Sequence, residues 1–137
     1  MTQEKTIFQK IIDDEIPSTK ICDNENFAAF LDAFPTSPGH TLVVTKEPYK
    51  DLLETPDEIS GKLLTFVKKL SIKIKEATGA DGIKLIMNNG AAAGQEVFHI
   101  HCHIIPRFKG DKWPAKYEYK EGEASEIANK IIAEFEN

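Results

Sequence analysis

Three of the four histidines in this chain alternate with apolar residues in one short segment, His99-Ile100-His101-Cys102-His103. Side chains along a β-strand point alternately to opposite faces of the sheet, so the pattern predicts imidazoles on one face and apolar groups on the other. We place the strand over residues 97–105 and expect Pro106 to end it, because proline cannot donate a ladder hydrogen bond. The chain therefore has to form a sheet that is covered on its apolar face.

The remaining patterns predict an α+β fold with a mainly antiparallel sheet. Amphipathic spacing predicts one long helix over residues 56–77, with a capping box from Thr55 to Glu58 and Gly79 as its C-terminal stop. Two other helices are expected, a short N-terminal one over residues 6–12 and a C-terminal one over residues 125–135. Other strands are expected over residues 19–22, 27–31, 41–45 and 83–88.

Length and composition indicate a single domain over residues 1–137, with a core over 6–108 and a C-terminal tail with its helix over 109–137. The net charge of −5 and the single arginine argue against the basic surface of a general nucleic-acid binder. No apolar run approaches the ~20 residues of a membrane span, and the first twenty residues lack the cationic start of a secretory signal. We therefore expect a cytoplasmic protein with neither nucleic acid nor membrane as its partner.

The histidine row itself indicates a functional site. Burying three imidazoles is costly unless a ligand, a metal or water contacts them. Two interpretations remain open from the residues alone: a zinc site with three histidine ligands, or an imidazole nucleophile that acts on a bound anion. The segment before the strand favours the nucleophile, because Gly90 and Gly94 allow backbone N–H groups to approach an anion, and Asn88 and Gln95 add amide donors.

The segment from His99 to Ile105 resembles the signature of the histidine-triad (HIT) family, His-φ-His-φ-His-φ-φ, where φ is apolar. The resemblance extends in order over roughly residues 6–108 and is closest to the Hint-like, protein-kinase-C-interacting-like branch. The other matching segments are Ile7-Phe8, Lys10-Ile11-Ile12, Ile16-Pro17, Phe30-Leu31-Asp32, Pro38-Gly39-His40, Leu42-Val43-Val44, Asn88-Asn89-Gly90 and Gly94-Gln95-Glu96-Val97.

This resemblance implies a homodimeric nucleotide-binding hydrolase that cleaves purine nucleoside phosphoramidates, with an AMP-type or GMP-type substrate and no cofactor. His101 would attack the α-phosphorus and form a nucleotidyl-histidine, with His99, His103 and His40 completing the catalytic set. The implied phosphate-binding residues are Asn88, Gly94, Gln95, Glu96, Val97 and His103. The implied nucleoside-binding residues are Ile7, Phe8, Ile11, Ile16, Phe30, Leu31 and Asp32.

The chain departs from the family pattern in three places. Zinc-binding members often carry Cys-x-x-Cys near the N-terminus, where this chain has Thr6-Ile7-Phe8-Gln9, so we expect no metal site. Glu96 stands where many eukaryotic members carry Ser or Thr, and its carboxylate would repel a phosphate. We therefore expect this carboxylate to point away from the phosphate, toward the leaving group or a cation such as Lys112 or Lys116. Trp113-Pro114 resembles a pair that reaches the partner subunit's site in some members, but here some twenty further residues follow it.

Three other functions remain open at this point. A dinucleoside polyphosphate hydrolase would use the same site and would need cationic contacts, for which Arg107, Lys109 and Lys112 are candidates. A nucleotide-sensing interaction module would turn over its ligand only incidentally. A metallohydrolase would use the histidine row as zinc ligands.

Overall fold

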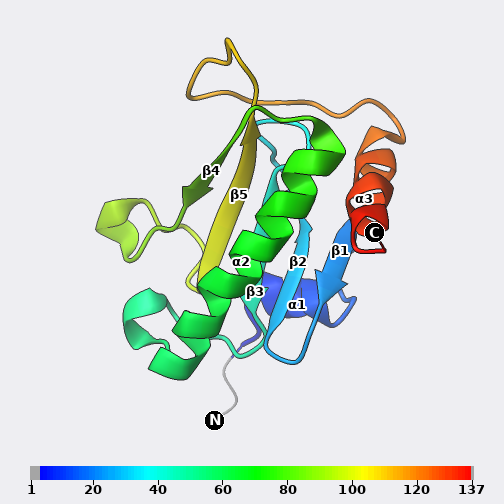
Figure 1. The fold of residues 1–137 in the computed structure, drawn as a ribbon. Coiled ribbons are helices and arrows are strands. Elements are labelled where there is room, and N and C mark those ends of the chain that lie inside the picture. The colour runs from blue at the N-terminus through cyan, green and yellow to red at the C-terminus, as the bar shows by residue number, and fades with distance from the viewer. Residues whose placement is uncertain (1–3, 137) are drawn as a thin grey trace.

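A computed structural model of the chain describes residues 4–136 and contains one five-stranded sheet in the order β1-β2-β3-β5-β4 (Figure 1). All neighbouring strands pair antiparallel, which confirms the predicted fold class. The strands are β1 (Lys20–Asp23), β2 (Phe27–Leu31), β3 (Thr41–Thr45), β4 (Gly82–Ile86) and β5 (His101–Arg107).

Helices cover both faces of the sheet. The long helix α2 (Asp57–Thr78) crosses one face, with the C-terminal helix α3 (Glu123–Glu134) beside it, and the short helix α1 (Ile7–Ile12) lies on the other face (Figure 1). Two 3₁₀ turns, η1 (Leu52–Glu54) and η2 (Ala91–Ala93), complete the described elements. Within residues 4–136, every helix is too short or too polar to span a lipid bilayer.

The two helical layers create two separate apolar cores. On the α2 face, Leu63, Val67, Leu70 and Ile74 recur at helical spacing and pack over the apolar side of β5. On the α1 face, a smaller cluster joins α1 to β2 and β3; its buried members are Phe8, Ile11, Ala28, Phe30, Leu42 and Val44. Because α1 has only six residues, it covers only part of this face, to which β5 contributes His101 and His103 opposite Val44 and Leu42.

The strand that carries the histidines differs from the prediction at both ends. It begins at His101 rather than residue 97, and it continues through Pro106 to Arg107. Pro106 lies opposite Ile83 of β4, and its carbonyl accepts a hydrogen bond from the Ser37 hydroxyl on the other side, at 2.7 Å. The N–H that proline lacks would also have pointed to that other side, so its loss leaves the pairing with β4 intact.

The start of α2 also differs from the prediction. Pro56 is the N-cap and makes no side-chain cap, while the Thr55 hydroxyl donates to the Asp51 carbonyl at 2.7 Å. The predicted capping box is therefore wrong. The predicted stop is confirmed, because Gly79 follows Thr78 in the left-handed conformation with φ of 72°.

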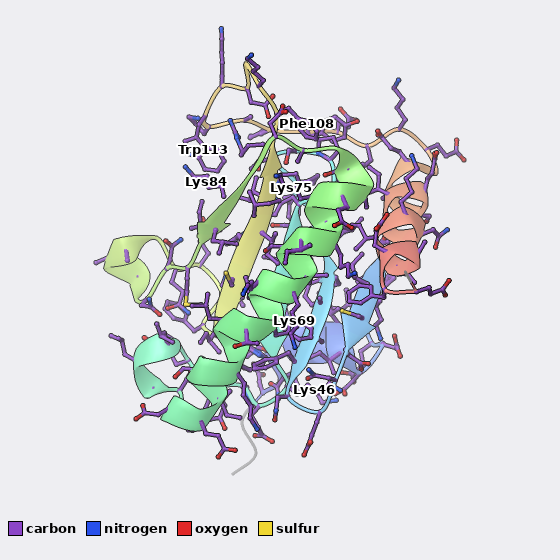
Figure 2. The ribbon with its side chains drawn as sticks, in the orientation of Figure 1. Lys46, Lys69, Lys75, Lys84, Phe108 and Trp113 are labelled. Carbon is purple, nitrogen blue, oxygen red and sulfur yellow. The ribbon has the colours of Figure 1, made fainter. Side chains whose placement is uncertain are left out.

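After β5 the chain crosses the end of α2 on its way to α3, as the orange segment of Figure 1 shows. At the start of this segment, Trp113 packs against cations of its own chain: Lys84 Nζ lies 4.4 Å and the Arg107 guanidinium carbon 5.1 Å from the ring centroid (Figure 2). Further along, the backbone N–H of Tyr117 donates to the Pro35 carbonyl at 2.9 Å. The tail is thus attached to the loop that joins β2 to β3.

We expect Gly39→Ala to destabilise the fold more than Gly90→Ala, by about 3 kcal/mol against about 1 kcal/mol. Both glycines have positive φ, 87° and 97°, so both substitutions strain the backbone. Only at Gly39 would the new Cβ also collide, 2.8 Å from Thr78 Cγ2, whereas at Gly90 no atom lies within 4 Å. Urea unfolding of the two variants measures the difference, and equal losses would contradict the close packing of Gly39.

Candidate active site

A pocket of about 720 Å³ opens on the α1 face of the sheet, a volume typical of a small-molecule site. Apolar side chains from α1, from the segment that follows it and from β2 line one part of it, namely Ile7, Phe8, Ile11, Ile16, Phe30 and Leu31. Polar residues and the loop before β5 line the rest, namely Asp32, His40, Asn88, Gly94, Glu96, Val97, His101 and His103. The structure therefore brings most of the predicted site residues to one cavity.

His101 has its reactive nitrogen fixed by the backbone. Its Nδ1 lies 2.7 Å from the carbonyl oxygen of His99, and because a carbonyl can only accept, Nδ1 carries the proton. In a neutral ring, Nε2 then keeps its lone pair. Burial lowers the pKa of His101, although the bond to His99 and the charge of Asp32 oppose the shift, so the ring is neutral at pH 7. A neutral imidazole with a free lone pair can act as a nucleophile.

His99 supports this arrangement from beneath and does not line the pocket. Its side chain is fully buried, and Nε2 lies 2.6 Å from the Thr45 carbonyl oxygen, so the proton is on Nε2. Nδ1 accepts from the Thr6 hydroxyl at 2.6 Å. Thr6 is also the N-cap of α1 and forms a capping box with Gln9. Thr6 and Gln9 stand where zinc-binding family members carry the two cysteines, and here they cap α1 through hydrogen bonds. His99 connects this helix to β3, because its ring bonds to both Thr6 and Thr45.

His40 and His103 form a second hydrogen-bonded pair. The backbone N–H of Thr36 donates to His40 Nδ1 at 3.1 Å, so the proton of neutral His40 is on Nε2. This nitrogen lies 3.0 Å from His103 Nδ1 and 3.4 Å from Asp32 Oδ2. His40 therefore donates to His103, whose own proton must be on Nε2. Burial lowers the pKa of each to about 4, and for His103 the two neighbouring histidines add to the effect, so both rings are neutral at pH 7.

The ligand atoms of Asp32, His40 and His103 lie within 4.8 Å of one another, which is close enough to hold one metal ion. The hydrogen bonds argue against this use. Neutral His40 carries its proton on Nε2, at the centre of the group, and moving it to Nδ1 would bring it against the Thr36 N–H. The geometry fits a hydrogen-bond relay better than a metal site.

The loop before β5 uses several of its own polar groups to hold its shape. The Gln95 amide donates to the carbonyls of Lys50 and Val97, at 2.7 and 3.1 Å, and accepts from the Gly90 N–H at 2.8 Å. Gln95 is only 4% exposed and does not line the pocket, so it positions the loop instead of contacting a phosphate as expected.

Several donors of this loop remain available to an anion. The backbone N–H groups of Gly94 and Gln95 are already bonded to Ala91 and Gly90, so Gly94 cannot contribute its N–H to a phosphate without breaking the turn. Within residues 4–136, neither the Asn88 side-chain amide nor the Val97 N–H has a hydrogen-bond partner. In the same part of the chain the Glu96 N–H also has no backbone partner, so the pocket-lining residues of this loop offer these three donors.

The pocket lining contains two carboxylates but no lysine or arginine. Glu96 lines it and has no ion pair within the described part of the chain, so the expected contact with Lys112 or Lys116 is wrong. Arg107 is turned away, packed on Trp113 and donating to the Lys112 carbonyl at 3.1 Å. Because the histidines are neutral, Asp32 and Glu96 are the charged groups of the lining.

The HIT domain family model matches residues 13–110 of this chain. The chain belongs to the HIT family. An uncharacterized HIT-like protein of Methanocaldococcus jannaschii is 42% identical over 128 residues, covering 91% of this chain and 97% of that protein. The adenylylsulfatase HINT3 of Arabidopsis thaliana is 42% identical over 109 residues, covering 80% of this chain and 55% of that protein. A hypothetical histidine triad nucleotide-binding protein from Sulfolobus tokodaii superimposes with a TM-score of 0.88 at 35% identity, covering 95% and 91% of the two chains.

HIT membership confirms the family predicted from the histidine motif, and the structure adds residues that the motif did not indicate. Thr36 fixes the tautomer of His40, and Thr6 and Thr45 hold His99. Tyr119, from the C-terminal tail, lines the pocket. Among these residues, only Thr6 lies at a position that the family comparison had singled out, the first cysteine position of the zinc-binding members. Thr36, Thr45 and Tyr119 lie outside every matching segment.

We expect the free energy of unfolding to fall as the pH drops from 7 to 5. The folded pKa of His40 is about 4 and the unfolded value about 6.5, so its stabilising contribution is complete above pH 6.5 and declines as the unfolded chain takes up the proton. The loss from His40 alone is about 2 kcal/mol over this range. Asp32, whose pKa burial raises, acts weakly in the opposite sense.

Urea unfolding at pH 7, 6 and 5 measures this dependence, with His40→Gln as the comparison. The variant should show a shallower decline, because the group that titrates has been removed. Identical pH dependence in the two proteins would contradict a neutral, buried His40.

Proposed function

We propose that the protein is a nucleotidyl hydrolase that cleaves purine nucleoside phosphoramidates at the α-phosphorus. The observation that carries the proposal is the neutral His101, whose Nε2 lone pair is left free by the hydrogen bond from Nδ1 to the His99 carbonyl. Attack by Nε2 forms a bond to phosphorus while the bond to the amine breaks. The amine takes up a proton as it leaves, and water then cleaves the nucleotidyl-histidine and releases a proton, so the ring ends as it began.

The surroundings of His101 suit both steps. When Nε2 bonds to phosphorus the ring becomes positively charged, and the His99 carbonyl that accepts from Nδ1 stabilises that charge. His103 has its proton on Nε2 and can donate it to a phosphate oxygen. Asn88 and Val97 supply free donors of the loop. The apolar part of the pocket would hold the base, and Asp32 the ribose.

The charges of the pocket favour a phosphoramidate over a dinucleoside polyphosphate. A phosphoramidate brings about one negative charge at the reacting phosphate, whereas a polyphosphate brings several that require cations. No lysine or arginine is among the lining residues, and two carboxylates are. The three candidate cations, Arg107, Lys109 and Lys112, are not among the lining residues, and Arg107 packs on Trp113 instead.

The comparisons support a catalytic function and a nucleotide ligand. The Arabidopsis relative is named an adenylylsulfatase, and the Sulfolobus tokodaii structure is described as a hypothetical nucleotide-binding protein. In a module that only senses nucleotides, the lone pair of His101 would need no fixed direction. Backbone groups fix the tautomers of His40, His99 and His101, and the His40 side chain fixes that of His103, which favours the enzyme.

We further propose that two copies of the chain form a homodimer through α2 and β4. The edge strand β4 has unpaired backbone groups on its outer side, which proteins normally cover. Leu85 of β4, opposite Ile104, is 44% exposed, and Leu64 of α2 is 65% exposed. Exposed leucines on adjoining elements are typical of an interface.

We expect His101→Ala to abolish turnover of adenosine 5′-phosphoramidate while the affinity for AMP stays within about tenfold of wild type. The nucleophile is lost, but the residues proposed to hold base, ribose and phosphate remain. As a matched variant, His103→Ala should keep measurable turnover because His101 Nε2 is still present. Turnover is measured beside that of a diadenosine polyphosphate, which we expect to be the poorer substrate.

Retention of more than a few per cent of the activity in His101→Ala would contradict the nucleophile assignment. Faster cleavage of the diadenosine polyphosphate by the wild-type protein would contradict the proposed substrate class.

We expect light scattering at micromolar concentration to give the mass of two 15.3 kDa chains. Leu85→Lys should shift the equilibrium to the monomer, because the charge would be buried in the interface. Ile72→Lys is the matched control: this residue is 49% exposed on α2, turned about 80° away from Leu64. A monomeric wild-type protein would contradict the proposed dimer.

A further inference from the structure

The C-terminal tail reaches the same pocket as the histidines. Tyr119 and Ala124 line it together with Asp32, Phe34 and Thr36, although the tail lies beyond the matched HIT domain, which ends at residue 110. The family resemblance assigns no function to the residues after Pro114. Figure 1 shows it crossing the end of α2 before it enters α3.

The tail is held at a defined place against the loop between β2 and β3. The Tyr117 N–H donates to the Pro35 carbonyl, and the Tyr117 hydroxyl donates to Glu123 at 2.6 Å. Glu123 also accepts from the Lys120 N–H at 2.9 Å, at the start of α3. The half-buried ring of Tyr119 packs against the α2-side core. These contacts fix the position of the Tyr119 side chain.

The hydroxyl of Tyr119 already accepts one hydrogen bond, and its proton is free to be donated. Its oxygen accepts from the Gly39 N–H at 2.9 Å, and within residues 4–136 its proton has no acceptor. Burial is the main cause that raises the pKa of Tyr119, and the charge of Asp32 adds to it, so the hydroxyl is protonated at pH 7. Tyr119 is thus a donor on the wall of the pocket.

Asp32 lies at the same end of the pocket. The loop closes through a hydrogen bond from the Asp32 N–H to the carbonyl of His40, the residue after Gly39, at 2.9 Å. The Asp32 carboxylate lines the pocket and is 14% exposed, enough to contact a ligand. A carboxylate can only accept, whereas the Tyr119 hydroxyl can here only donate. A ligand group that satisfies both must donate and accept, as an alcohol hydroxyl does.

We infer that Tyr119 donates a hydrogen bond to a ribose hydroxyl whose own proton is accepted by Asp32, so that the tail makes this pocket select ribonucleotides over deoxyribonucleotides. The inference rests on the proposed nucleotide-binding function and extends it to a segment outside the HIT domain. Tyr119 would then be a specificity-determining residue.

The test compares the affinities for AMP, 2′-deoxy-AMP and 3′-deoxy-AMP, measured by calorimetry on the full chain. The wild-type protein should bind AMP about tenfold more tightly than at least one deoxy analogue. Tyr119→Phe should weaken AMP binding about fivefold, the loss expected for one neutral hydrogen bond, and leave that analogue within about twofold. Tyr49→Phe, which removes a tyrosine hydroxyl outside the pocket, is the matched control and should change neither affinity beyond about twofold.

Three results would overturn the inference. Equal binding of AMP and both deoxy analogues by the wild-type protein would show no selection for ribose, a result that needs no variant to fold. Tyr119→Phe could weaken all three ligands by the same factor, which would mean that the hydroxyl only holds Gly39. Tyr119→Phe could also leave AMP binding unchanged. A wild-type protein that binds none of the three would contradict the proposed function itself.

Discussion

The hydrogen bond from His101 Nδ1 to the carbonyl of His99 decides which nitrogen of the central histidine faces the pocket. Backbone carbonyls do not titrate and cannot donate, so this tautomer is fixed as long as the carbonyl keeps its position. The position depends on His99, whose own ring is held between Thr45 of β3 and the N-cap of α1. Helix α1 also supplies part of the apolar lining. The proposed nucleophile and the proposed base site therefore both depend on the position of this helix.

The second pair of histidines follows the same physical logic. The Thr36 N–H fixes His40, and His40 fixes His103. Each ring is buried enough to stay neutral, and each has one nitrogen committed to a partner, so the free nitrogens differ in character: a lone pair on His101 and an N–H on His103. For the proposed reaction, the lone pair can attack phosphorus while the N–H donates to one of its negatively charged oxygens.

Much of the fold could be predicted from the sequence because its signals are local. The alternation around His101 predicts a strand, and the spacing from Leu63 to Ile74 predicts the helix that covers it. The strand boundaries could not be predicted, since the continuation through Pro106 depends on β4, a partner distant in sequence. The N-cap of α2 was missed for a similar reason, because η1 already uses the Thr55 hydroxyl.

The candidate site shows the same division. The sequence could predict which residues gather at the site. It could not predict which of them face the pocket and which only hold the neighbouring backbone in position. The amide of Gln95 could bind a phosphate, but it is hydrogen-bonded to the backbone of Gly90 and Lys50. These bonds depend on the folded path of the backbone and leave no signal in the sequence. Tyr119 lies outside every motif, and its approach to Gly39 depends on how the tail crosses the end of α2.

The most direct test of this account is the protonation state of the imidazole nitrogens at pH 7, measured by long-range ¹H–¹⁵N correlation on uniformly labelled protein. Signals of His101 are assigned as those absent from His101→Ala. The account predicts a neutral His101 with its proton on Nδ1, and neutral His40, His99 and His103 with their protons on Nε2. A His101 ring that carries its proton on Nε2, or that is doubly protonated at pH 7, would contradict the central role of the His99 carbonyl.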